Sequence, residues 1–177
     1  EQRRLEQLEK LRQRAASGLL EPIAGGLAWL ALHQGEDGEI SDDAAAVRCN
    51  AVAHTPPCTS MGGVGKGQNK LSATALAVLA FVDFRDQDLA GLFEPSLGAA
   101  TGWLRRQMKK DGSFPSAGYE GAIALMALGQ AARASGSKPL LADVERGLAF
   151  VAAKASSDGG YRYRWGDLGD LSVTGWY

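Results

Sequence analysis

Apolar residues recur three and four positions apart through most of the chain, and short stretches rich in Gly, Pro, Asp and Ser separate these periodic segments. Residues at this spacing share one face of a helix, so the pattern predicts amphipathic helices. The predicted helices cover residues 22–33, 72–85, 95–109, 119–134 and 140–155, and another is predicted to start at Leu171. An irregular loop is expected between the first two helices, ending at Lys70.

Three segments repeat one pattern in the same register. Each has a small residue, an aromatic residue three positions later, an Asp-Gly pair eight positions after the aromatic residue, and a large residue two positions after the glycine. The copies are Gly26, Trp29, Asp37-Gly38 and Ile40; Ala100, Trp103, Asp111-Gly112 and Phe114; and Gly147, Phe150, Asp158-Gly159 and Tyr161. Glycine ends a helix in the left-handed conformation, and aspartate accepts local backbone hydrogen bonds. The repeat therefore predicts stacked helix pairs joined by equivalent turns.

This pattern resembles the QW motif of the squalene cyclase and protein prenyltransferase superfamily, in which Gln and Trp tie successive helix pairs together. The matching residues of the first copy are Gly26, Trp29, Leu30, Gln34 and Gly38. Ile40 stands in place of the final Trp, and Met108 and Ala155 stand in place of Gln in the later copies. The resemblance covers roughly residues 20–177. It implies an all-α fold, an α/α toroid whose inner and outer helices alternate around a cavity.

Two further segments, 118–131 and 158–177, resemble large bacterial proteins with prenyltransferase and squalene-oxidase type repeats, most of which have no assigned function. Closed toroids of the superfamily use more helix pairs than three copies supply. The remainder of the ring is therefore expected in sequence outside this chain or in another chain.

The chain divides into a lead-in segment and a repeat domain. Residues 1–18 predict a charged helix, because Leu5, Leu8 and Leu11 give it only a narrow apolar stripe. Residues 19–177 predict the α/α-toroid repeat domain. The aromatic residues of the three copies lie at 29, 103 and 150, so the first two copies are separated by extra sequence, an insertion at 41–70. Long insertions in repeat arrays tend to lie on the functional face.

Composition narrows the choice of partners. Hydrophobic residues make up 45% of the chain and glycine is abundant, which suits closely packed helices. The chain has 19 basic and 20 acidic residues and a net charge of −1, so no nucleic-acid partner is expected. No apolar run approaches the roughly 20 residues of a membrane span. The compartment stays unknown from the sequence.

The insertion carries Cys49, His54 and Cys58, which include both cysteines of the chain. Thiolate and imidazole are zinc ligands, and a structural site would need a fourth ligand such as Asp43 or His33. Alternatively the two cysteines form a disulfide, if the protein is exported, or remain as uncoupled thiols. We expect the thiol state and no cofactor, with zinc as the metal that this set of residues would hold.

Other motifs argue against familiar catalytic sites. The glycine-rich segment at 62–67 lacks the spacing of a phosphate-binding loop. It resembles the stretch before the zinc-binding helix of protein prenyltransferase β subunits, but Ala73 and Ala75 stand where that family has its zinc-binding Asp and Cys. The Asp-x-Asp-Asp acid of class II terpene cyclases does not occur in the sequence.

Aromatic residues near the starts of the predicted inner helices are the candidates for ligand binding. These residues, with one carboxylate, are Tyr119, Glu120, Tyr161, Tyr163, Trp165 and Trp176. They would line the cavity and hold an isoprenoid chain or a cation, or they would serve only to pack the repeats. Asp170 precedes the last predicted helix, where an N-terminal cap is favoured over acid catalysis.

These observations favour a non-catalytic binding or scaffolding module within a larger bacterial protein. Its expected partner is an apolar or isoprenoid ligand, or another protein. The alternative is an isoprenoid-processing enzyme, similar to a terpene cyclase or prenyltransferase, whose catalytic residues lie outside this sequence.

Overall fold

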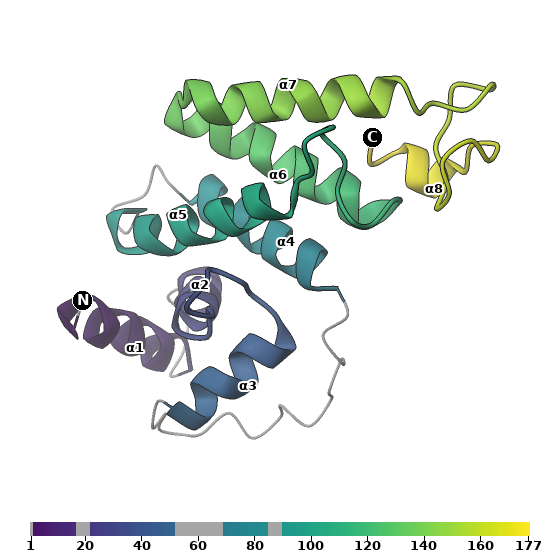
Figure 1. Ribbon diagram of the computed structural model, residues 1–177. Helices are drawn as coiled ribbons and strands as arrows, with labels where there is room; N and C mark the ends of the chain where they lie inside the picture. Colours follow the sequence, from purple (N-terminus) through teal and green to yellow (C-terminus); the bar gives the residue numbers. More distant parts are fainter. Residues whose placement is uncertain (1, 17–21, 52–68, 85–89) are drawn as a thin grey trace.

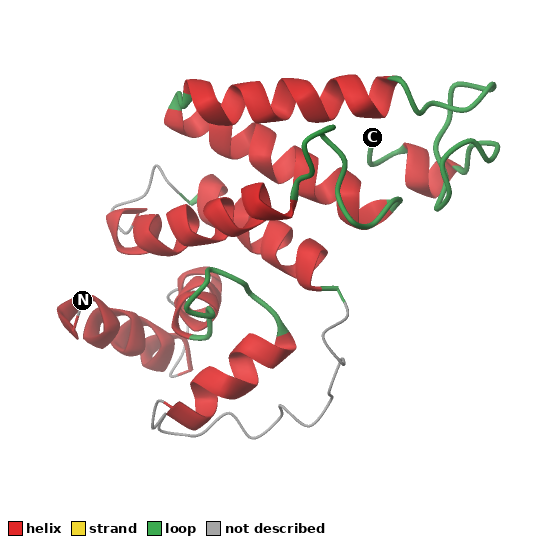
Figure 2. Cartoon of the chain, in the orientation of Figure 1, coloured by secondary structure: helices red, strands yellow, loops and turns green. Residues whose placement is uncertain are grey.

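The structure is a computed structural model, which describes residues 2–16, 22–51, 69–84 and 90–177 (Figure 1). All regular secondary structure in these ranges is helical, as the sequence predicts (Figure 2). The helices are α1 (Gln2–Ala16), α2 (Pro22–Leu32), α3 (Asp42–Ala51), α4 (Lys70–Asp83), α5 (Ala90–Gln107), α6 (Tyr119–Ser135), α7 (Lys138–Ala152) and α8 (Leu171–Thr174).

The helices form two alternating series. We call α4, α6 and α8 the central series, and α2, α5 and α7 the flanking series. In the central series α4 packs against α6, while α5 lies on α4 and α7 lies on α6. The stack runs from α1 and α2 at one end to α7 at the other (Figure 1). The all-helical fold is therefore confirmed.

The core lies where the two series meet. Its largest completely buried side chains include Phe81 of α4, Phe93 and Leu104 of α5, and Leu128 of α6. The rings of Phe81 and Phe93 stack with their centroids 5.8 Å apart, which joins the two series. Trp103, the aromatic residue of the second copy, is only 6% exposed.

The lead-in segment forms a helix, as predicted, and packs on the flanking series. Leu8 and Leu11 of α1 are buried against the core, and α1 lies along α2. The guanidinium of Arg4 donates to the carbonyl oxygen of Leu92 at 3.0 Å and to the hydroxyl of Ser96 at 2.6 Å. The narrow apolar stripe and one arginine thus attach α1 to both α2 and α5.

Two predicted boundaries are wrong. The insertion is not irregular throughout, because residues 42–51 form α3. Ser41 caps this helix by accepting the Ala44 N–H at 3.1 Å, and two aspartates in its first turn interact favourably with the helix dipole.

Helix α5 begins at Ala90 rather than at Pro95, which lies inside it on an exposed face. The carbonyl group that loses its partner to Pro95 belongs to exposed Gly91 and can bond water.

The three Asp-Gly turns have the same backbone hydrogen bonds. In each, the N–H two positions before the aspartate donates to the carbonyl two positions after it, at 2.8, 2.8 and 3.0 Å in chain order. The aspartate Oδ1 accepts the N–H two residues later, at 3.0 Å in all three copies. The glycines Gly38, Gly112 and Gly159 have positive φ angles of 96°, 90° and 80°. The predicted equivalence of the turns is confirmed.

Each of the first two turns lies directly on the next flanking helix. A Cβ atom at Gly38 would clash with the carbonyl group of Ala99 in α5, and one at Gly112 would clash with that of Arg146 in α7. Only glycine allows this approach of backbone to backbone. The small residue of the repeat, Ala100 or Gly147, follows the contacted carbonyl, which explains its place in the pattern.

Side chains reinforce the first of these junctions. The amide of Gln34 is buried and donates to the carbonyl oxygens of Gly38 and Ser96, each at 3.0 Å. The indole N–H of Trp103 donates to Asp37 Oδ2 at 3.1 Å. The Gln and the aromatic residue of the repeated pattern therefore tie the first turn to α5.

The central helices α4 and α8 begin in the same way. The hydroxyl of Thr74 accepts the Ile40 N–H at 3.0 Å and donates to the Ile40 carbonyl oxygen at 3.2 Å. Thr174 makes the same two bonds with Tyr161, at 2.9 and 3.2 Å. The helix start predicted at Leu171 is therefore present, and α8 enters the central series as α4 does.

Candidate functional site

Most of the candidate ligand-binding residues gather near the starts of α6 and α8. Tyr119 and Tyr163 meet edge to face with their ring centroids 5.4 Å apart. The Tyr119 hydroxyl shares a hydrogen bond of 2.7 Å with the hydroxyl of Ser172. Tyr163 is 54% exposed, and the neighbouring Tyr119 hydroxyl raises its pKa. These two rings bridge the first turn of α6 and the loop that precedes α8.

Tyr161 and Trp165 pack with two residues that were not among the candidates. The Tyr161 ring lies 4.6 Å from that of Tyr177, and the Trp165 ring lies 5.5 Å from Phe150 and 5.8 Å from Tyr177. The Tyr177 hydroxyl donates to the carbonyl oxygen of Gly118 at 3.1 Å. Burial raises the pKa of Tyr177 to about 12.

The role of Tyr177 was missed in the sequence, although a signal was present. Val173 is buried on α8, and Tyr177 lies four positions later, beyond the end of the helix at Thr174. In the longer helix that the sequence suggests, these two residues would share one face. Trp176, which was chosen, is 40% exposed. Helical periodicity counted from Val173 would have selected Tyr177 in its place.

These aromatic side chains fill the space between them. The cavity lined by Phe114, Phe150, Trp165 and Tyr177 measures about 10 Å³. This is about the smallest cavity that holds a single water molecule and is far below the several hundred Å³ of a small-molecule site. The cluster therefore packs the third turn against α6 in this conformation, in agreement with a packing role for Tyr161 and Trp165.

Asp170 is the N-cap of α8. Its Oδ1 accepts the Val173 N–H at 3.1 Å and the Ser172 hydroxyl at 2.5 Å. These hydrogen bonds, first from Ser172 and then from Val173, lower the pKa of Asp170. A general acid must be protonated at working pH, so the environment of Asp170 supports capping.

Glu120 lies elsewhere, in a groove where the N-terminal ends of α4 and α6 come together. The groove has a volume of about 410 Å³ and is lined by Asn69, Lys70, Leu71, Trp103, Gln107, Pro115, Ser116 and Glu120. Lys70 pairs with Glu39 at 3.1 Å and with Asp43 at 3.3 Å. The hydrogen bond to Glu39 is the main cause that raises the pKa of Lys70. The groove thus combines an aromatic and an aliphatic wall with charged groups at its rim.

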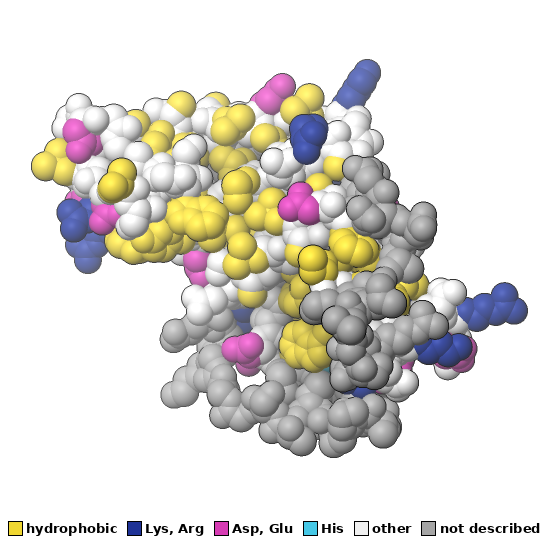
Figure 3. Space-filling model, turned by 180° about the vertical axis from the view of Figure 1, so that it is seen from behind, with side chains coloured by type: hydrophobic (Ala, Val, Ile, Leu, Met, Phe, Trp, Pro, Cys, Tyr) yellow, Lys and Arg dark blue, Asp and Glu magenta, His cyan; other side chains and the backbone are white. Residues whose placement is uncertain are grey.

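One exposed face of α4, which we call the apolar stripe, carries almost no charged side chains. Leu76 is exposed, and Ala73, Leu79 and Ala80 beside it are partly exposed. Met126 is exposed on the neighbouring α6. Seen from behind, hydrophobic and uncharged side chains predominate over the upper and middle parts of the molecule (Figure 3). Contiguous exposed apolar surface is typical of interaction sites, so this face is a candidate for binding.

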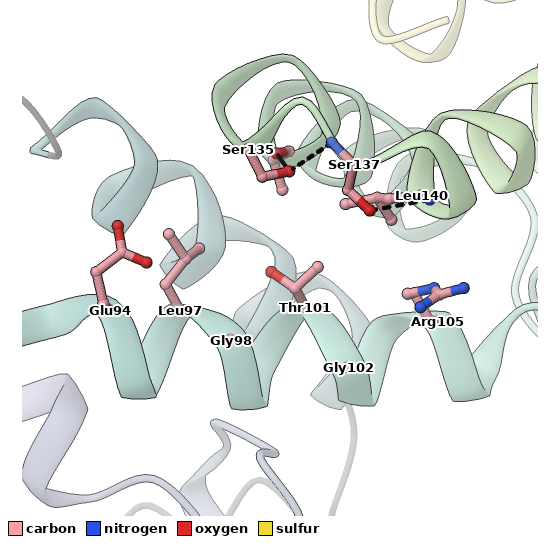
Figure 4. Close-up of a pocket in the computed structure, with 10 residues that line it drawn as sticks. Glu94, Leu97, Gly98, Thr101, Gly102, Arg105, Ser135, Ser137 and Leu140 are labelled. Carbon is pink, nitrogen blue, oxygen red and sulfur yellow. Dashed lines mark hydrogen bonds between the residues drawn. The ribbon is translucent and has the colours of Figure 1, made fainter.

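A second groove of about 250 Å³ lies in the flanking layer, between α5 and the junction of α6 with α7 (Figure 4). Gly98 and Gly102 have no side chains to fill the groove on the side that α5 forms. Arg105 lies at the rim and pairs with Asp143 at 2.6 Å. The hydroxyl of Thr101 is buried and has no hydrogen-bond partner among the residues that the structure describes. The hydroxyls of Ser135 and Ser137 are already bonded within their own turn.

The proposed metal ligands fall mostly outside the described residues. Cys49 belongs to the last turns of α3, whereas His54 and Cys58 lie in the segment that the structure does not describe. Within the described ranges, no group of three or more His, Cys, Asp or Glu residues is arranged to hold a metal ion. The thiol, disulfide and zinc states of the insertion therefore stay predictions.

Comparisons of the chain with protein-family models, with curated proteins and with solved structures find no match. Among the described helices, none has the length and hydropathy needed to cross a membrane.

Proposed function

We propose that this chain is a segment of an α/α toroid that serves as a binding or scaffolding module. The observation that carries the proposal is the repeated junction, in which an Asp-Gly turn lies on the next flanking helix. Repeats that contact only their neighbours build extended or curved arrays, whose function lies in the surface that they present. The central series would form the inner wall of such a ring.

The binding surface in this proposal is the groove at the ends of α4 and α6, together with the apolar stripe beside it. Trp103 and Leu71 offer apolar contact in the groove, and Lys70 lies at its rim. An isoprenoid chain suits the apolar wall. Its terminal hydroxyl would lie near the charged rim, where Glu39 and Asp43 already pair with Lys70. Its volume of about 410 Å³ is within the range of small-molecule sites.

The carboxylates near the candidate residues support binding rather than catalysis. Asp170 is engaged as a cap, and Asp158 and Asp111 accept the hydrogen bonds that shape their turns. The pKa values of all three are lowered, mainly by the Ser172 hydroxyl, the Ser156 hydroxyl and the Ser113 N–H respectively. A cyclase-like acid would need the opposite shift. An enzyme of this class would have its catalytic groups outside this sequence.

Tryptophan fluorescence tests this proposal, because Trp103 lines the groove. Titration with farnesol and with farnesyl diphosphate should change the emission with saturation, and neither compound should be converted. Gln107→Phe fills the groove and should abolish the change, whereas Ala142→Phe on the exposed face of α7 should not. Turnover of the diphosphate would favour the enzyme, and the lack of any saturable change would refute ligand binding in this groove.

A further inference from the structure

The two internal junctions define what a third one would need. In both, the glycine of the turn is buried and its Cα faces the carbonyl group before a buried small residue, Ala100 or Gly147. In the first, Trp103 also donates to the aspartate of the turn. In the second, Phe150 occupies the position of the tryptophan, so this junction forms without that bond.

The third turn has the shape of the other two, but none of the described helices lies on it. Gly159 has the same positive φ and the same hydrogen bonds as Gly38 and Gly112. It is nevertheless exposed, and a Cβ atom built there meets nothing within 4 Å. The turn is thus formed before any docking, and its docking side is open.

Helix α2, the first of the flanking series, has an uncovered surface at the position where such a turn would lie. Gly26 takes the place of Ala100 and Gly147, yet it is exposed and a Cβ atom there also meets nothing within 4 Å. Ile23 is 68% exposed, whereas its equivalents Leu97 and Val144 are 7% and 8% exposed. An apolar groove of about 430 Å³ follows this side of α2, lined by Ile23, Gly26, Leu27, Trp29, Leu30 and Ala80.

The polar groups on the two open faces also match. Trp29 has the position of Trp103, and its ring stacks on His33 at 4.1 Å. Asp158 has the position of Asp37. It already accepts three hydrogen bonds, from the Ser156 hydroxyl and from the N–H groups of Gly160 and Gly169, the latter two at 3.0 and 2.9 Å. A carboxylate has about four acceptor sites, so Asp158 can also accept an indole N–H. Docking would recreate the Trp-Asp bond of the first junction.

We propose that the third turn of one copy of this chain docks on helix α2 of a second copy, with Gly159 against the Gly25 carbonyl and Gly26. The two faces lie at opposite ends of the helix stack (Figure 1). The contact is therefore head to tail, and it joins two different surfaces instead of pairing one surface with itself. The proposal goes beyond the binding function, since it depends on the repeat junction and not on the ligand.

Sedimentation equilibrium over a range of concentrations tests the proposal. The chain should associate to at least twice its own mass. Gly159→Asn should weaken association by about 100-fold or more, because its Cβ atom would clash with the docked carbonyl. Asparagine tolerates the left-handed conformation, so the turn itself should form. Gly26→Leu should weaken association likewise, because it blocks the surface of α2. Gly26→Ala should leave association unchanged, because Ala100 has the equivalent position in the first junction.

Mixing the two blocked variants gives the decisive readout. Each should be monomeric alone, with the helical circular dichroism of the parent chain. An equimolar mixture should form a heterodimer, because the Gly159→Asn chain keeps its α2 face and the Gly26→Leu chain keeps its third turn. Trp29→Phe should weaken association by only about tenfold, through loss of one hydrogen bond. A parent chain that stays monomeric, or variants that associate without loss, would overturn the proposal.

Discussion

At the scale of a residue, one added methyl group measures how closely a turn approaches the helix on which it lies. Gly112 and Gly136 both have positive φ, 90° and 65°, but only the first lies against another helix. Gly136→Ala should cost about 1–2 kcal/mol of unfolding free energy from backbone strain alone. Gly112→Ala should cost that amount and several kcal/mol more, because its Cβ atom clashes with the carbonyl group of Arg146. Urea unfolding of both variants measures the difference. Equal losses of unfolding free energy would show that the turn at Gly112 does not lie against the carbonyl group of Arg146.

Trp103 contributes both volume and a hydrogen bond, and two substitutions separate them. Trp103→Ala should lower the unfolding free energy by about 3–5 kcal/mol, because the ring is buried in the core. Trp103→Phe should cost only about 1–2 kcal/mol, since it loses the bond to Asp37 but keeps an aromatic ring, as Phe150 does in the third copy. A loss below about 1 kcal/mol for the alanine variant would place the ring on the surface.

At the scale of an element, the sequence predicts most of the helices and turns, but it does not predict helix α3. Apolar periodicity located α4, α6 and α7 within a few residues, and the Asp-Gly pairs located the turns. Helix α3 was missed because Ser41-Asp42-Asp43 looks like a polar loop, although Ser41 is a good N-cap. Capping and loop formation use the same residues, so only the packing of the following segment decides between them.

The aromatic candidates show a different limit of the sequence. The sequence brings Tyr161 and Trp165 near the start of a helix, but it does not show whether a cavity lies between them. Here Phe150 and Tyr177, distant in the chain from each other, fill that space. Cavity size depends on how all the surrounding side chains pack, which no local pattern encodes.

At the scale of an element, alkaline pH should loosen the end of the chain that follows α8. Burial raises the pKa of Tyr177 to about 12, whereas an unfolded tyrosine titrates near 10. The neutral phenol thus stabilises the fold fully below about pH 10, and this contribution is lost as pH rises towards 12.

The difference in tyrosinate absorbance between the parent chain and Tyr177→Phe reports this titration. It should have its midpoint near 12. The phenylalanine variant keeps the ring contacts and should lack this pH dependence. A midpoint near the ordinary value of about 10 would mean that the Tyr177 ring is exposed.

At the scale of the whole molecule, stability should depend on the junctions between neighbouring repeats. The junctions are unequal. The first has the Gln34 amide bonded to both Gly38 and Ser96. The second has Met108 at the equivalent position, near the guanidinium of Arg146 at 3.6 Å. The third turn has Ala155 there, and no helix within the described ranges lies on its glycine. Placing glutamine at positions 108 and 155 therefore tests whether the hydrogen bonds of this side chain stabilise the contact between repeats or only the turn itself.

Gln34→Ala should lower the unfolding free energy by about 1–3 kcal/mol, because two buried carbonyl groups lose their donor. Met108→Gln should raise it by about 0.5–1.5 kcal/mol, because its amide would reach the carbonyls of Gly112 and Asp143, the equivalents of those bound by Gln34. Ala155→Gln should change it by less than about 0.5 kcal/mol in the monomer, where no following helix offers the second carbonyl. Urea unfolding at low protein concentration compares the three. Equal gains at positions 108 and 155 would show that the glutamine stabilises only its own turn, and that the repeats are held together by backbone contact alone.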